Sequence, residues 1–141
     1  VVNFVMNDKC AAGTGRFLDM MAKTLEMSLE ELSHTGLKWK EDITISSMCT
    51  VFAESEIVSL VAENKSLDDI VHGLNQSVAG KTVNLVKRAG GLGAYMMTGG
   101  VAQNAGVVQA IEARLGEKLR VSPMAQYCGA LGAALFAMET V

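Results

Sequence analysis

The spacing of apolar residues changes along the chain, and each change marks an expected element. Residues 1–6 form a short apolar, β-branched run that ends at Asn7, which predicts a strand. After the glycine-containing segment at 11–16, apolar residues recur at helical spacing and predict a helix over residues 14–27. The buried face of this helix is expected to consist of Phe17, Leu18, Met21, Ala22 and Leu25.

Two sequence signals predict the starts of further helices. Ser28 and Glu31 have the spacing of a capping box and predict a short helix that Gly36 closes. Ser66 and Asp69 predict the start of a long helix that ends in the glycine run at 90–93. The buried stripe expected for the long helix is Leu67, Ile70, Val71, Leu74, Val78, Leu85, Val86 and Ala89.

The segment between these two helices is less regular. Ile43 and Ile45 alternate as in an exposed strand. Helical spacing resumes over residues 51–64. The apolar positions that carry it are Val51, Phe52, Ile57, Leu60 and Val61.

The last third of the chain switches to a strand, glycine turn and helix pattern. Residues 94–98 predict a buried strand, Gly99 and Gly100 a tight turn, and residues 105–115 a helix. A strand at 119–121 then leads into a small-residue helix that is expected to pack closely on the sheet. This alternation predicts an α/β fold in one compact unit.

Composition narrows the class of protein. The 141 residues suffice for one domain or one lobe of a larger one, and a hydrophobic fraction of 50% excludes disorder. A net charge of −3 without a long basic run argues against binding nucleic acid or a membrane surface. No apolar run reaches the roughly 20 residues that span a bilayer. With three cysteines, the sequence predicts a soluble protein of the reducing cytoplasm.

Two cysteines stand in similar positions just before expected helices. Cys10 precedes the helix at 14–27 and Cys49 precedes the helix at 51–64, where backbone N–H groups and the helix dipole favour a thiolate. Either residue could instead be a small buried hydrophobe. Two thiolates cannot complete a four-thiolate site, but a symmetric dimer could supply four to a [4Fe–4S] cluster or to zinc. Cys128 is expected in the core.

Two glycine turns are candidate nucleotide contacts. One runs from Ala11 through Gly13, Thr14 and Gly15, and the other includes Gly99, Gly100 and Asn104. Backbone without side chains before a helix can approach a phosphate or nucleoside closely, although such turns are often simple connections.

The charged side chains give weaker indications. The two histidines, His34 and His72, are expected on the solvated surface. The carboxylates of Glu54, Glu56 and Glu63 are expected on a solvated face or as a charge set at an interface.

Four blocks together resemble one family. NDKCAAGTGRFLD, CTVFAESEIVSL, MTGGVAQNAGV and GALGAAL occur in the order of the CoA-substrate-specific enzyme activases. These proteins activate 2-hydroxyacyl-CoA dehydratases and are related to the BadF/BadG/BcrA/BcrD ATPases of benzoyl-CoA reductase. The resemblance implies one lobe of the ATPase fold shared by acetate kinases, sugar kinases, Hsp70 and actin, which is ribonuclease H-like.

The resemblance also implies a function. Members are homodimers of anaerobic metabolism that hold one [4Fe–4S] cluster between two subunits, and the ligands carry over onto Cys10 and Cys49. ATP hydrolysis with Mg²⁺ changes the angle between helices at the cluster and drives one-electron transfer to the dehydratase. The cluster receives electrons from a donor such as ferredoxin or flavodoxin.

The resemblance assigns the glycine turns to the nucleotide. Gly99, Gly100 and Asn104 map to the nucleoside contacts, and Gly13, Thr14 and Gly15 to the neighbourhood of the phosphates. The chain lacks the family's N-terminal phosphate motifs, so residues 1–141 are expected to be the C-terminal lobe without the phosphate-binding lobe. No catalytic residue is assigned within it.

Three alternatives remain open. The first is the ATPase subunit of a benzoyl-CoA reductase. The second is a non-redox dimerisation module in which the two cysteines bind zinc or no metal. The third, a sugar or acetate kinase lobe, leaves the paired cysteine blocks unexplained.

Overall fold

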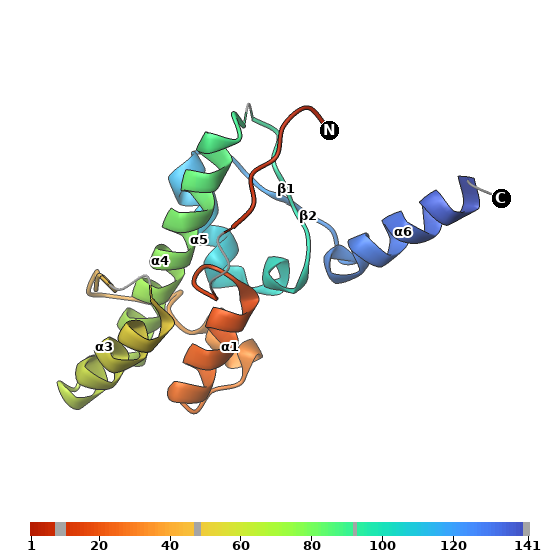
Figure 1. Cartoon of the computed structure of the whole chain (residues 1–141). Helices are drawn as coiled ribbons and strands as arrows, with labels where there is room; N and C mark the ends of the chain where they lie inside the picture. The colour runs from red at the N-terminus through yellow and green to blue at the C-terminus, as the bar shows by residue number, and fades with distance from the viewer. Residues whose placement is uncertain (8–10, 47–48, 92, 140–141) are drawn as a thin grey trace.

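The computed structural model describes residues 1–7, 11–46, 49–91 and 93–139. The described chain is mainly helical and carries a small parallel sheet (Figure 1). Its elements in order are α1 (Gly15–Thr24), α2 (Leu29–His34), α3 (Thr50–Ala62), α4 (Leu67–Arg88), β1 (Met96–Met97), the 3₁₀ helix η1 (Gly100–Gln103), α5 (Ala105–Leu115), β2 (Arg120–Val121), the 3₁₀ helix η2 (Ala125–Tyr127) and α6 (Cys128–Glu139).

Helix α4 is the centre of the fold, and α5 packs along it. The two helices approach closely at Gly106, where a Cβ atom would lie only 3.1 Å from Cγ of the buried Asn75. A glycine at this point of α5 therefore lets the helix lie flat against α4. The shared core is formed mainly by Phe17, Leu18, Met21, Leu32, Ala53, Ile57, Ile70, Val71, Leu74, Val78, Val107 and Ile111.

Both predicted caps are confirmed. The Ser28 hydroxyl accepts a hydrogen bond from the Glu31 amide at 3.1 Å, and the Glu31 carboxylate accepts one from the Ser28 amide at 2.8 Å. Hydrogen bonds from the Ser28 backbone amide and side chain to the carboxylate lower the pKa of Glu31. At the start of α4, the Ser66 hydroxyl accepts from the Asp69 amide at 3.1 Å. Each cap satisfies helix N–H groups that have no intrahelical partner.

The strand, glycine turn, helix and strand order is also confirmed. Strands β1 and β2 pair in parallel, with Met96 opposite Arg120 and Met97 opposite Val121, and η1 and α5 form the crossover between them. Helix α5 ends at Gly116, whose φ of 72° is the left-handed conformation expected of a C-terminal glycine. The prediction of a buried strand is wrong, because Met96 is 66% exposed.

Two other strand predictions are wrong. The structure assigns no strand to residues 1–7, which lie largely exposed along the surface, because an extended run becomes a strand only when a partner pairs with it. Ile43 and Ile45 are buried rather than exposed and belong to an irregular segment. This segment presses on α4, where a Cβ atom at Gly73 would lie 2.5 Å from the Ile43 carbonyl oxygen.

The helix faces also differ from the prediction in places. In α3, Ala53 and Ile57 are buried, whereas Val51, Phe52 and Val61 are exposed, because α1 and α4 cover only one side of this helix. In α4, Leu67 is exposed and Leu85, Val86 and Ala89 are half-buried, while Ala79 and Val83 join the core.

The small-residue helix does not pack on the sheet as predicted. Helix α6 projects away from the rest of the described chain and buries none of its residues (Figure 1). Cys128, at its start, is only half-buried, so its predicted place in the core is wrong. The ladder of β1 and β2 is two residues long, which is too small a surface to cover a 12-residue helix.

Candidate functional site

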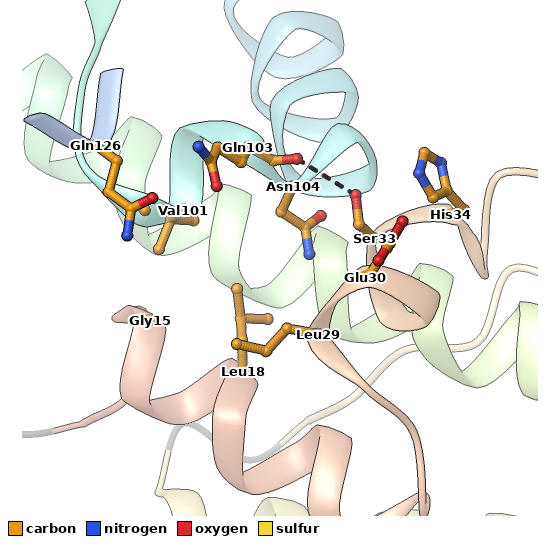
Figure 2. A pocket seen from close by; sticks show the side chains of 11 residues that line it. Gly15, Leu18, Leu29, Glu30, Ser33, His34, Val101, Gln103, Asn104 and Gln126 are labelled. Carbon is orange, nitrogen blue, oxygen red and sulfur yellow. Dashed lines mark hydrogen bonds between the residues drawn. The ribbon is translucent and has the colours of Figure 1, made fainter. Parts of the chain in front are cut away.

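A cavity of about 790 Å³ lies where the two glycine turns meet. Figure 2 shows Leu18 rising from α1 and Leu29 from α2 on one side, with η1 and the start of α5 on the other. The cavity is lined by Gly15, Leu18, Leu29, Glu30, Ser33, His34, Gly100, Val101, Gln103, Asn104 and Gln126. Because η1 and η2 follow the carboxyl ends of β1 and β2, the cavity lies where open α/β sheets bind ligands.

Gly15 brings the two turns into contact. A Cβ atom at Gly15 would lie 3.2 Å from Cγ2 of Val101, tighter than an ordinary van der Waals contact. The glycine at the start of α1 therefore permits the approach of η1. Two segments about 85 residues apart in sequence therefore line the same cavity.

The second turn presents bare backbone to the cavity. Gly99 has a φ of 88°, a conformation that favours glycine, and its amide donates to the Ala125 carbonyl at 2.8 Å. Next to it, a Cβ atom at Gly100 would meet no atom within 4 Å. A ligand can therefore approach the Gly100 backbone directly.

Asn104 combines a structural role with a polar group at the cavity. It is buried, and its Oδ1 caps α5 by accepting from the Val107 amide at 2.9 Å. This bond fixes the side chain, and its amide nitrogen points into the cavity (Figure 2). Such a fixed amide can donate to an acceptor atom of a bound ligand.

Ser33 ties α2 to the same rim. Its hydroxyl donates to the Gln103 carbonyl at 3.4 Å (Figure 2). The same hydroxyl accepts from the Ala105 amide at 2.8 Å. Ser33 is buried, so these bonds replace the water that its hydroxyl would otherwise bind. The position of α2 is thereby set relative to the start of α5.

The structure divides the six residues predicted to contact the nucleotide into two groups. Gly15, Gly100 and Asn104 line the cavity, whereas Gly13, Thr14 and Gly99 are not among its lining residues. Gly13 packs against the Lys81 side chain, and Thr14 is the N-cap of α1, with its hydroxyl donating to the Ala11 carbonyl.

Sequence reasoning missed the contribution of α2 and η2 to this cavity. Leu29, Glu30, Ser33 and His34 all lie in the short helix that the capping box predicted. These residues reach the cavity because Ser33 bonds to residues about 70 positions later in the chain. A local sequence pattern cannot indicate such a contact. Gln126 comes from η2, a single turn that had no sequence signal.

The two histidines differ in environment. His34 is exposed at the end of α2, as predicted. The prediction for His72 is wrong, since its side chain is only 12% exposed. Its ring stacks on Trp39 with a centroid distance of 4.1 Å, and its Nε2 lies 3.5 Å from an Asp42 carboxylate oxygen, beside a second hollow of about 470 Å³.

Cys49 lies at the N-terminus of α3, as predicted. It is the N-cap residue, its side chain is exposed, and its carbonyl accepts from the Ala53 amide at 2.9 Å. The first turn of α3 contains no acidic residue that would oppose a thiolate.

Cys10, the other predicted ligand, lies outside the described residues. Within those residues, no group of three or more His, Cys, Asp or Glu side chains could hold a metal ion.

The three glutamates of this region are not equivalent. Glu54 and Glu63 are exposed, as predicted, and Glu54 accepts from the Thr24 hydroxyl at 3.3 Å. Glu56 is half-buried and accepts bonds from both the amide and the hydroxyl of Ser46. Glu56 is therefore less exposed than a fully solvated face would leave it, and its place in a charge set at an interface stays a prediction.

The fold and the cavity define one lobe of the ATPase fold shared by acetate kinases, sugar kinases, Hsp70 and actin. The chain belongs to the BadF/BadG/BcrA/BcrD ATPase family, whose model matches residues 1–137. No helix within the described part of the chain is long and apolar enough to cross a membrane.

Three known proteins show the extent of the similarity. The (R)-2-hydroxyglutaryl-CoA dehydratase activating ATPase of Acidaminococcus fermentans is 52% identical over 99% of the chain and 54% of its own length. The solved activator of 2-hydroxyisocaproyl-CoA dehydratase from Clostridium difficile, with bound ADPNP, is 48% identical with a TM-score of 0.95, over 99% of this chain and 52% of that one. A benzoyl-CoA reductase component from Thauera aromatica is 31% identical over 96% of the chain and 50% of its own length. The chain thus spans about half the length of these relatives.

Proposed function

We propose that this chain is the C-terminal lobe of an ATP-hydrolysing activator that donates single electrons to a 2-hydroxyacyl-CoA dehydratase. The observation that carries the proposal is the 52% identity, over 99% of the chain, with a dehydratase activating ATPase. The 31% identity with a component of benzoyl-CoA reductase makes that system the second candidate. We call the longer polypeptide that would contain residues 1–141 the parent protein.

The residues that line the cavity support its assignment as one half of an ATP site. Gly15 and Gly100 leave backbone accessible, and Asn104 offers a fixed amide donor beside the apolar Leu18 and Leu29. Apolar walls with a few fixed polar groups suit a nucleoside. No lysine or arginine occurs among these lining residues, so most of the charge compensation for a triphosphate and Mg²⁺ is assigned to the N-terminal lobe of the parent protein.

The cysteines support a shared metal centre. Cys49 has an exposed thiol at a helix N-terminus, which fits a thiolate ligand, and we propose Cys10 as the second ligand from each subunit of a homodimer. A [4Fe–4S] cluster supplies one-electron transfer when bound. A ferredoxin or flavodoxin is the proposed upstream donor.

The protein's own residues have defined roles in this proposal. The N–H groups of the first turn of α3 stabilise negative charge on Cys49. The backbone at Gly100 and the amide of Asn104 orient the nucleoside, and Ser33 holds the rim of its site in place.

The proposal is tested by anaerobic reconstitution of the parent protein with iron and sulfide. The wild-type protein is expected to be a dimer with one four-iron cluster, and Cys10→Ser or Cys49→Ser to lose it. Cys128→Ser is the matched control and should keep full iron content, because Cys128 lies at the start of α6, remote from α3 (Figure 1). A colourless protein that contains zinc would favour the non-redox module. A monomer that holds a full cluster would refute the shared site.

A further inference from the structure

Glu56 holds Ser46, which lies three residues before Cys49. Its Oε1 and Oε2 lie 3.0 and 3.1 Å from the Ser46 backbone nitrogen, and 3.1 and 3.2 Å from the Ser46 hydroxyl oxygen. The carboxylate thus accepts bonds from two donors of one residue. Hydrogen bonds to a charged acceptor are stronger than neutral ones.

Chain connectivity passes this restraint on to Cys49. Only two residues separate Ser46 from Cys49, so the two Cα atoms cannot be further apart than about 11 Å. Glu56 lies seven residues after Cys49, close to two turns along α3, and therefore on the same side of the helix. The carboxylate fastens Ser46 to the helix that Cys49 caps.

We infer that Glu56 is a positioning residue for the Cys49 thiolate and so for the proposed cluster. The inference rests on the proposed function, because it assigns Glu56 a role at a metal ligand. Cys49 is fixed from the helix side by the bond between its carbonyl and the Ala53 amide. Glu56 supplies the restraint from the other side, through Ser46.

The chain offers a matched control on the same helix. Glu54 is exposed, and it accepts a hydrogen bond from Thr24 of α1 rather than from the segment before Cys49. Glu54 and Glu56 are two positions apart, and removing either carboxylate changes the net charge by the same amount. A difference between the two variants therefore reports the hydrogen bonds of Glu56, those with Ser46 included, and not the loss of charge.

The first experiment measures amide hydrogen exchange at Ser46 in the metal-free parent protein. Glu56→Ala should speed exchange about tenfold, whereas Glu56→Gln, which keeps one acceptor oxygen, should stay within about twofold of wild type. Glu54→Ala should match wild type. Equal exchange in the two alanine variants would overturn the inference.

The second experiment measures the loss of the reconstituted cluster to an iron chelator, together with the EPR signal of the reduced cluster. Glu56→Ala should release iron about tenfold faster and shift the EPR signal, and Glu56→Gln should restore both toward wild type. If Cys49→Ser keeps its cluster, the proposed function fails. If Cys49→Ser loses it while Glu56→Ala behaves like Glu54→Ala, only the role of Glu56 fails.

Discussion

Gly13 lies directly against the side chain of Lys81, which reaches it from the middle of α4. A Cβ atom at Gly13 would lie 2.8 Å from Cδ of Lys81. The Lys81 ammonium donates to the Ala12 carbonyl at 2.9 Å. The Lys81 side chain is therefore held at both ends, by this bond and by its backbone in α4. The first glycine turn is therefore fastened to the central helix next to the start of α1.

Gly13→Ala should destabilise the parent protein more than Gly116→Ala. Both glycines have positive φ, 77° and 72°, so each alanine carries the cost of a left-handed backbone, about 1–2 kcal/mol. At Gly13 the methyl group also displaces Lys81, whereas at Gly116 it meets no atom within 4 Å. We expect the free energy of unfolding in urea to fall by about 1 kcal/mol more for Gly13→Ala. Equal losses would show that the Lys81 contact adds nothing.

Gly100→Val should weaken nucleotide binding without lowering stability. The position has open space around it and faces the cavity, so the added side chain fits but occupies volume that a nucleoside would fill. Calorimetry of the parent protein with Mg-ATP should show an affinity lower by about tenfold or more, at an unchanged melting temperature. Gly129→Val, on exposed α6, is the control. Unchanged affinity in Gly100→Val would exclude this cavity as the nucleoside site.

Asp69 should make stability depend on pH in the acid range. The Ser66 hydroxyl and the amides of Lys40 and Glu41 donate to its carboxylate and lower its pKa from 3.8 to about 2. A lowered pKa means that the unfolded chain binds the proton more tightly. The stabilisation is therefore complete above about pH 4 and is lost as pH falls toward 2.

Urea unfolding between pH 2 and 6 measures this dependence. Asp69→Asn should be less stable than wild type at neutral pH and should lose the contribution of Asp69 to the acid transition. Ser66→Ala removes the hydroxyl donor and should move the transition to higher pH. An Asp69→Asn protein with the wild-type pH profile would contradict the assignment.

Residues 1–141 alone should bind ATP much more weakly than the parent protein. The described cavity is open and its lining lacks lysine and arginine, so the triphosphate would stay largely in water. Calorimetry with Mg-ATP should detect weak binding or none. Micromolar affinity would show that the described residues already form a complete site.

Local chemistry explains which elements the sequence could predict. Ser28 and Ser66 each cap a helix by bonding to a residue three positions later, so the spacing of these residues in the sequence predicts the caps. Gly116 likewise stops α5 through its own φ. These elements depend little on what packs around them.

Elements that depend on a partner surface were predicted less well. Phe52 and Val61 have helical spacing, but burial also needs a neighbour, and α1 and α4 cover the face that carries Ala53 and Ile57. The same reason applies to α6, whose apolar composition predicts burial that the described residues do not provide. His72 was misplaced because its stacking partner, Trp39, lies 33 residues earlier in a segment without regular structure.

The candidate site was partly predictable for the same physical reasons. Gly15, Gly100 and Asn104 could be found because small residues and a capping amide in turns that lead into helices are local features. Ser33 and Gln126 could not, because they reach the cavity only through tertiary contacts. The role of Glu56 was hidden because its bond to Ser46 reaches ten residues back from α3 into a segment without periodicity.

The bond between Gly99 and Ala125 gives helix α6 a mechanical relationship to the cavity. The helix starts directly after η2, and η2 is joined to the second glycine turn by this 2.8 Å bond. Twelve helical residues form a rod about 18 Å long, which continues directly from η2 at its base. A small rotation at the cavity rim is therefore enlarged at the far end of the rod, and a force applied there acts on the rim with leverage.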